Sequence, residues 1–236
     1  MTQATSPAPA WSRAHTFNSI WKFAKDFTSN TEKRMQRLWS LCESMRKTPG
    51  DIVEFGVYAG ASALVIANAF ELNRPAREQA DGSRHFWMID NYGTGLKRNG
   101  PHDRLPAGEF GGTGVRFPYS IEEAVRMKAT SELIRVEKRT IIEIDFGRSY
   151  ELSDIALEMP REFAFVHLDC TYHDDYWYGL DYFWPHVVPG GMLVVEEYGV
   201  EYAPGCKIAT DSFAKDAGLT FELNEDGEQA VFHKPA

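Results

Sequence analysis

The sequence predicts an α/β protein whose doubly wound, mostly parallel seven-stranded sheet follows an N-terminal helical extension. From Asp51 onward, short apolar runs alternate with helical patterns, and this alternation is typical of a parallel sheet with crossover helices on both faces. An acidic residue stands at the end of five of these runs. The chain closes with two runs around the polar turn Asn-Glu-Asp-Gly, which predict an antiparallel hairpin at one edge of the sheet.

Apolar periodicity and turn residues place the individual elements. The predicted strands are residues 51–54, 85–90, 139–145, 163–169, 192–198, 220–223 and 229–233. The helices predicted to follow the first strand are residues 61–73, 120–133, 149–159, 173–186 and 205–217. Capping-box spacing at Ser120 supports the start of the second of these helices.

Three segments differ in composition. Residues 1–14 are rich in Pro, Ser and Thr, and we expect them to be disordered. Residues 15–49 hold two amphipathic patterns, starting near Phe17 and Met35, which predict two helices that cover the site or contact a second subunit. Plain packing is the alternative for these helices. Residues 50–236 form the predicted main domain.

The overall composition narrows the class of protein. A net charge of −9 and a pI near 5.3 argue against a general nucleic-acid surface, and short basic clusters such as residues 34–37 are expected to be solvated. The three cysteines are far apart and odd in number, so they predict neither a disulfide framework nor a zinc site. No apolar run approaches the length needed to cross a membrane. We therefore expect a cytoplasmic protein without nucleic-acid or membrane partners.

The stretch from Gly50 to Ser62 predicts a ligand-binding turn. An apolar strand ends at the acid Glu54, and Gly56 and Gly60 then form a small-residue turn before a helix opens at Ser62. Glycines let the backbone approach a ligand closely, and the helix start offers free N–H groups. The spacing is G-x-x-x-G rather than the G-x-G-x-x-G that seats a pyrophosphate. An acid ahead of the turn suits a ligand with a free ammonium, so we expect S-adenosyl-L-methionine; ordinary strand–helix packing is the alternative.

The acids at the strand ends predict where that ligand and its reaction lie, because ligands in such sheets bind beyond the carboxyl ends of the strands. Asp90 stands where an acid commonly accepts hydrogen bonds from ribose hydroxyls. The predicted cofactor contacts are Glu54, Gly56, Tyr58, Gly60, Ser62, Asp90 and Asp145. Residues 91–118 form a long glycine-rich insertion, which predicts either a lid that orders on ligand binding or simple disorder.

Five landmarks in the same order resemble the macrocin O-methyltransferase (TylF-type) family over roughly residues 31–219. They are Glu32-Lys-Arg-Met35 with the glycine turn, Met88-Ile-Asp-Asn-Tyr-Gly93, Val166-His-Leu-Asp-Cys170, Val188–Gly199, and Gly205-Cys206 with Asp211-Ser-Phe213. The resemblance implies a Rossmann-like methyltransferase fold over residues 50–236. It also implies S-adenosylmethionine as cofactor and methylation of a hydroxyl, often on the sugar of a natural product.

Two departures from the family pattern fall on the edge expected to be catalytic. The family carries Leu-Asp-x-Asp-x-Tyr after the fourth strand, but Thr171 stands near the place of the second acid. The family's Asp-Asp pair after the fifth strand is replaced by Glu196-Glu197. The resemblance implies Asp169, Glu196 and Glu197 as Mg²⁺ ligands, and a metal-independent site is the alternative. The acids at 174 and 175 could replace the missing ligand or cap the next helix.

The reaction needs a base, because an alcohol is a poor nucleophile at neutral pH. Asp169 is the first choice as catalytic base, and His173 is the alternative, whereas His167 within its strand is expected to be structural. The aromatic run 172–184 predicts a helix that faces a substrate or a partner subunit, or that packs against the N-terminal helices.

The sequence thus predicts an S-adenosylmethionine-dependent O-methyltransferase acting on a small-molecule natural product, sugar or polyketide-like, as a homodimer or larger homo-oligomer. Two alternatives keep the cofactor: an enzyme that is metal-independent or does not methylate, and a binding protein without catalysis. A nicotinamide oxidoreductase is disfavoured, because the pyrophosphate glycine spacing is missing.

Overall fold

The computed structural model describes residues 16–72, 84–90, 100–103, 139–143 and 162–236. Several predictions lie outside these residues: the tail 1–14, the helices over 120–133 and 149–159, most of the insertion 91–118, and Asp145. The two predicted N-terminal helices are present as α1 (Phe17–Ala24) and α2 (Glu32–Ser44), joined by the 3-10 turn η2 (Lys25–Phe27).

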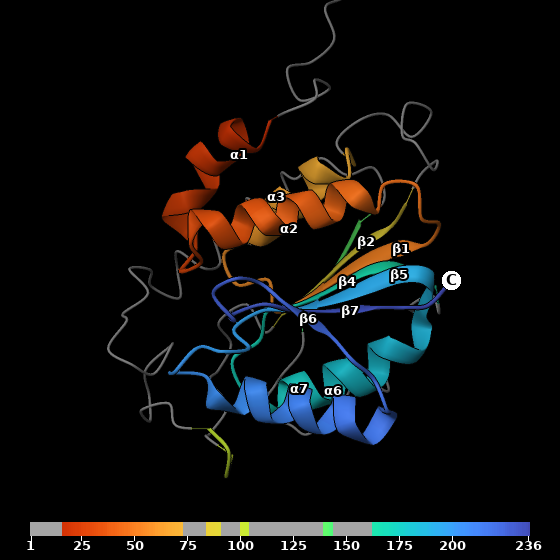
Figure 1. Cartoon of the computed structure of the whole chain (residues 1–236). Helices are drawn as coiled ribbons and strands as arrows, with labels where there is room; N and C mark the ends of the chain where they lie inside the picture. The colour runs from red at the N-terminus through yellow and green to blue at the C-terminus, as the bar shows by residue number, and fades with distance from the viewer. Residues whose placement is uncertain (1–15, 73–83, 91–99, 104–138, 144–161) are drawn as a thin grey trace, which may run out of the picture.

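The predicted α/β sheet is confirmed, with seven strands in the order β3-β2-β1-β4-β5-β7-β6 (Figure 1). The strands are β1 (Asp51–Phe55), β2 (Phe86–Asp90), β3 (Arg139–Glu143), β4 (Phe163–Leu168), β5 (Val187–Val195), β6 (Glu222–Leu223) and β7 (Ala230–His233). The first five pair in parallel, and the closing hairpin adds the antiparallel edge. The order reverses direction at β1 and β4, which is the point where such sheets bind ligands.

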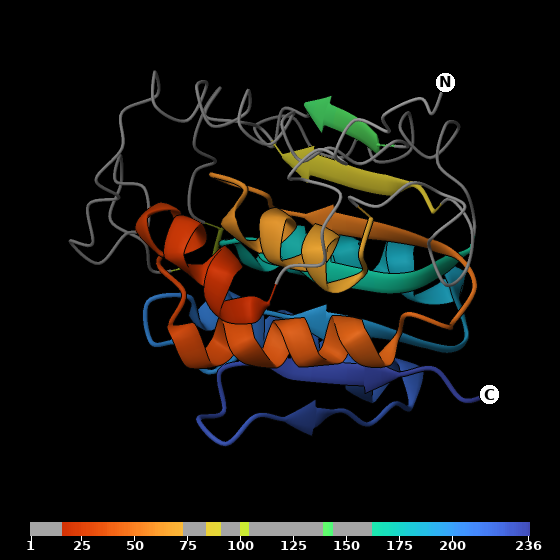
Figure 2. The same cartoon turned by 90° about the horizontal axis from the view of Figure 1, so that it is seen from above.

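Helices cover both faces of the sheet (Figures 1 and 2). Helices α1, α2 and α3 (Ala61–Ala69) lie on one face. Helices α6 (His173–Phe183) and α7 (Pro204–Ala217), with the 3-10 turn η4 (Trp184–His186), lie on the other. The aromatic helix α6 therefore packs against β4 and α7, and the prediction that it packs against the N-terminal helices is wrong. Its aromatic rings instead complete an apolar core with Phe163 and Phe55.

Alternation along the strands decides which side chains meet which helices. Ile52 and Phe165 point to the layer of α1–α3, whereas Val53 and Val166 point to the layer of α6 and α7. The same two-residue alternation places Glu54 and His167, which are paired across β1 and β4, under α2 and α3, where both are fully buried.

Several strand boundaries differ from the prediction, and those of β1 and β5 are the most informative. Strand β1 continues to Phe55, so Glu54 lies within the strand rather than at its end. Strand β5 begins at Val187, although Pro189-Gly-Gly191 is typical of a turn. The extension is stabilised because Gly190 and Gly191 exchange backbone hydrogen bonds with Lys234, just beyond β7. No described helix is both long enough and apolar enough to span a membrane.

Candidate functional site

The glycine turn after β1 depends on backbone conformations that side chains rarely adopt. Gly56 has φ +91° and Gly60, the N-cap of α3, has φ +80°. A Cβ on Gly56 would overlap the backbone carbonyl of Asp169, so glycine is required for β1 and β4 to approach each other here. The turn thus brings the start of α3 beside the carboxyl end of β4.

Asp90 supports this turn from the end of β2. Its Oδ2 accepts hydrogen bonds from the backbone N–H groups of Val57 and Tyr58, each at 2.6 Å. The predicted ribose contact is therefore also the residue that holds the cofactor turn in place.

A hollow of about 60 Å³, partly open to solvent, lies between this turn and the ends of β4 and β5. Its third wall is the loop of residues 27–30, which joins η2 to α2. The lining residues are Phe27, Thr28, Ser29, Asn30, Val57, Tyr58, Ala61, Ser62, Asp169, Cys170, Thr171 and Glu197. The hollow therefore lies between the predicted cofactor residues of the turn and two of the predicted carboxylates, Asp169 and Glu197.

The predicted cofactor contacts divide into two groups. Tyr58 and Ser62 line the hollow. Glu54, Gly56, Gly60 and Asp90 shape the turn or lie beneath it, and Asp145 is outside the described residues. No side chain caps the start of α3, and Ala61 and Ser62 in its first turn face the hollow. These features fit a ligand with polar groups near a helix N-terminus.

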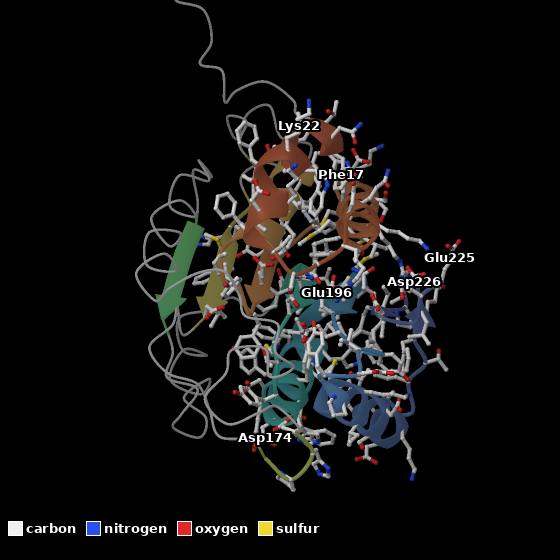
Figure 3. All side chains as sticks on the ribbon, turned by 90° about the vertical axis from the view of Figure 1, so that its left-hand side faces the viewer. Phe17, Lys22, Asp174, Glu196, Glu225 and Asp226 are labelled. Carbon is white, nitrogen blue, oxygen red and sulfur yellow. The ribbon has the colours of Figure 1, made fainter. Side chains whose placement is uncertain are left out.

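A buried polar network crosses the sheet beside the hollow. The two ring nitrogens of His167 lie 3.0 Å from Glu54 Oε1 and 3.2 Å from Glu196 Oε1. All three side chains are sealed from solvent. Figure 3 shows Glu196 at the centre of the molecule, between the two helical layers.

Arg34 of α2 completes this network from above the sheet. Its Nε and Nη2 donate to Glu196 Oε2 at 3.2 and 2.8 Å, and only 4% of Arg34 is exposed. The side-chain amide of Gln229 donates to Glu196 Oε1, and it also contacts the Arg34 carbonyl at 3.4 Å. Each oxygen of Glu196 therefore has two protein partners, which fill the lone-pair sites of a carboxylate.

The charges in this network are strongly coupled. Burial disfavours the charge on Glu196, yet hydrogen bonds from His167 and the Arg34 charge outweigh burial and lower its pKa to about 2. Burial also opposes the charge on His167, but its bonds to Glu196 and Glu54 raise its pKa to about 10. Burial raises the pKa of Glu54 above its usual value, although His167 lowers it in part. His167 and Arg34 thus act as two internal cations among carboxylates.

Two further carboxylates face the hollow. Asn30 Nδ2 donates to Asp169 Oδ2 at 3.2 Å, and burial together with Glu196 raises the pKa of Asp169 well above its usual range. Glu197 has φ +61°, and its Oε1 accepts a hydrogen bond from Tyr202 at 2.6 Å. Its Oε2 is buried without a hydrogen-bond partner among the described residues, and burial raises its pKa to about 7. This acceptor suits an incoming hydroxyl or ammonium group.

The predicted Mg²⁺ ligands do not fit a divalent cation. Mg²⁺ needs near-octahedral oxygen ligands, but both oxygens of Glu196 are taken by Arg34, His167 and Gln229. Within the described part of the chain, no group of three His, Cys, Asp or Glu side chains could hold a metal ion. Asp169 and Glu197 remain beside the hollow, whereas Glu196 faces Arg34.

The other predicted residues are placed as follows. His173 begins α6, where its Nδ1 lies 2.9 Å from Asp174 and its ring lies 4.4 Å from that of His102, and it does not line the hollow. Its role as an alternative base stays a prediction. Asp174 and Asp175 lie in the first turn of α6, where negative charge is favourable. Thr171, in place of the family's second acid, does line the hollow.

Sequence reasoning missed three residues of the site: Asn30, Arg34 and Gln229. The expectation that the basic cluster 34–37 is solvated is wrong for Arg34, which is buried against Glu196. A signal was present, because Arg34 lies four residues before Leu38 and therefore on the apolar face of α2. Nothing comparable marks Asn30 or Gln229, whose loops approach the site only in the folded chain.

No protein-family model matches the chain. A curated relative, the 8-demethyl-8-(2,3-dimethoxy-alpha-L-rhamnosyl)-tetracenomycin-C 4'-O-methyltransferase of Streptomyces olivaceus, is 21% identical over 214 residues, or 85% of this chain and 72% of that protein. Among solved structures, the calicheamicin methyltransferase CalS11 matches at TM-score 0.66 and 14% identity, over 98% of this chain and 99% of its own. CalS11 is also described as a TDP-rhamnose 3'-O-methyltransferase. An O-methyltransferase from Bacillus cereus in complex with SAH matches at TM-score 0.54 and 10% identity, over 97% and 92% of the two chains.

The chain thus has the Rossmann-like α/β fold of these methyltransferases. The comparisons also support the resemblance to the macrocin O-methyltransferase family and the predicted enzyme class.

Proposed function

We propose that this protein is an S-adenosylmethionine-dependent O-methyltransferase that methylates a hydroxyl of a small-molecule natural product, with a sugar as the first substrate class to test. The observation that carries the proposal is the hollow in which the glycine turn after β1 meets Asp169 and Glu197. The choice of a sugar is supported by relatives named for methylation of a rhamnosyl group and of TDP-rhamnose.

The residues of the chain divide the work of binding. The uncapped start of α3 and the turn at Tyr58 and Ser62 would hold the polar end of the cofactor, and Asp90, which holds the turn, would bind the ribose. When bound, S-adenosylmethionine supplies an electrophilic methyl group on a sulfonium. The loop of residues 27–30 forms one wall of the hollow, which remains partly open to solvent.

The carboxylates at the hollow handle the proton of the acceptor. An in-line approach of the hydroxyl needs a group that orients it and takes its proton. Asp169 is the proposed base, positioned by Asn30, and the unpartnered Oε2 of Glu197 accepts a second hydrogen bond from the acceptor. Asp169 would take the proton of the acceptor hydroxyl as the methyl group passes from the sulfonium to the oxygen and leaves a neutral thioether.

The first test is calorimetric titration with S-adenosylhomocysteine, with NAD⁺ as the control ligand. We expect micromolar-range binding of the former alone, and weaker binding by Asp90→Ala. Methyl transfer is then assayed by mass spectrometry against nucleotide-linked deoxysugars and rhamnosylated polyketides. Absence of binding would overturn the proposal, and binding without transfer to any acceptor would favour the non-catalytic alternative.

The quaternary state and location belong to the same proposal. We propose a homodimer or larger assembly, supported by the aromatic N-terminal helices and by Phe23 on α1, which is 69% exposed. Light scattering after gel filtration tests it, and a monomer at micromolar concentration would contradict it. All three cysteines are free and buried, which fits a reducing cytoplasm.

A further inference from the structure

We propose that the Arg34 guanidinium takes the place of a divalent cation beside Asp169, Glu196 and Glu197, the carboxylates that follow β4 and β5. The site then works with a built-in cation and does not bind Mg²⁺. The inference rests on the proposed function for its meaning, but its geometry stands independently. Arg34 is a positioning residue in this scheme, since it acts on the carboxylates and does not line the hollow.

The first argument is the saturation of Glu196. Two nitrogens of Arg34 occupy its Oε2, and His167 and Gln229 occupy its Oε1. A cation could enter only if one of these buried donors left, and that donor would then lose its partner. The arginine guanidinium is permanently charged and weakly hydrated, so it suits a buried ion pair.

The second argument is the position of the Arg34 charge. Its Nη2 lies 2.8 Å from Glu196 Oε2, and its Nη1 lies 3.7 Å from Glu228 Oε2. Glu196 is one of the three carboxylates that the family resemblance implies as metal ligands. A permanent cation therefore already lies against the carboxylate that a metal would have to bind.

The third argument is the way helix α2 presents Arg34. Thr31 caps the helix by accepting the Arg34 N–H at 3.3 Å, and the main chain of Arg34 is held by Gln229. Leu38 and Met35 pack the same helix onto α3 and the sheet. The N-terminal extension thus supplies the cation as part of the folded core.

The test measures Mn²⁺ binding by electron paramagnetic resonance after EDTA treatment, using MnCl₂ alone as probe. We expect no stoichiometric Mn²⁺ binding by the wild-type protein and no change of its thermal midpoint with Mg²⁺. Arg34→Met should bind Mn²⁺ at least about tenfold more tightly than wild type, because the carboxylates that have lost the arginine charge then attract a dication. Its lowered thermal midpoint should rise again as Mn²⁺ is added.

Lys33→Met is the matched control. It removes one positive charge from the neighbouring position, where Lys33 is paired with Glu225 and Asp226 at the surface. Figure 3 shows those two acids far from Glu196. Lys33→Met should leave Mn²⁺ binding unchanged. An Arg34→Met protein that binds Mn²⁺ no better than Lys33→Met would overturn the assignment to Arg34.

Two further measurements keep the inference testable. Arg34→Lys retains a cation and should still exclude Mn²⁺. A purely structural role for Arg34 makes no such distinction between lysine and methionine. Stoichiometric Mn²⁺ binding by the wild-type protein overturns the inference even if Arg34→Met fails to fold. Titration of the wild-type protein with S-adenosylhomocysteine separates the two proposals. Absence of binding counts against the proposed function alone, whereas stoichiometric Mn²⁺ binding by the wild-type protein counts against the inference alone.

Discussion

The two faces of one sheet are built from adjacent residues of the same strands and both carry an apolar core, yet they differ in chemistry at the carboxyl ends of β1, β4 and β5. On the side of α6 and α7, Phe55, Leu168 and Val195 lie in an apolar core. One residue away along the chain, on the side of α2, Glu54 and His167 form a buried ionic network with Glu196. The alternation of side chains across a strand makes this separation possible.

Both faces stabilise the fold through their apolar residues, but the α2 face also carries the ionic network beside the hollow. Apolar contacts on the α6–α7 face depend on volume and tolerate no cavity without loss of stability. The ionic network contributes less net stability, because desolvation opposes its attractions, but removing one member leaves a buried charge without a partner. Only the ionic face continues into the hollow, through Asp169 and Glu197.

The largest effect is expected for Asp169→Asn. Loss of the proposed base should lower kcat by about 10²–10⁴-fold, because the acceptor hydroxyl then has no group to take its proton. Asparagine keeps the size of the side chain, so the thermal midpoint should change little. Steady-state methyl transfer and thermal unfolding measure the two quantities, and unchanged kcat would remove Asp169 from the base role.

The next effect is expected for Glu196→Leu, which breaks the ionic face. Arg34 and His167 both lose their shared carboxylate, and we expect the free energy of unfolding to fall by about 3–5 kcal/mol. Glu228→Gln is the matched control, since Glu228 is 35% exposed and only 3.7 Å from the same arginine. The control should change stability by less than about 1 kcal/mol. Urea unfolding of both variants tests the contrast, and equal effects would contradict it.

Leu180→Ala tests the apolar face by the same quantity, the free energy of unfolding. Leu180 is fully buried in the core under α6, and truncation should lower the free energy of unfolding by about 2–5 kcal/mol. Because Leu180 does not line the hollow, kcat should be retained at temperatures where the variant is folded. A specific loss of kcat with normal stability would mean that the two faces are coupled.

Much of the fold could be predicted because strand and helix periods, and the turn residues between them, are local signals. The parallel sheet with its antiparallel hairpin follows from such signals. The early start of β5 could not be predicted, because it depends on backbone bonds from Gly190 and Gly191 to Lys234, at the far end of the chain. Sequence marks Pro-Gly-Gly only as a turn.

The sequence allowed the acidic residues of the site to be located, but not their hydrogen-bond and ion-pair partners. The rule that ligands bind at strand ends selected Asp169, Glu196 and Glu197. Which of them is neutralised depends on Arg34, which is 162 residues from Glu196 in the sequence. In a short charged cluster, the position of Arg34 on the apolar face of α2 is the one sequence signal that separates it from a surface residue.

The smallest effect is expected at the cap of α2, and it tests how firmly the helix holds Arg34 in place. Thr31→Ala removes the side-chain acceptor for the Arg34 N–H and should lower the free energy of unfolding by about 1 kcal/mol. Thr16→Ala, at the cap of α1, should cost a similar amount but leave Mn²⁺ exclusion intact, because α1 carries no member of the ionic network. If Thr31→Ala alone admits Mn²⁺, the start of α2 frays and releases the built-in cation. If neither variant does, the hydrogen bonds among Arg34, Glu196 and Gln229 are sufficient to hold the guanidinium without the cap.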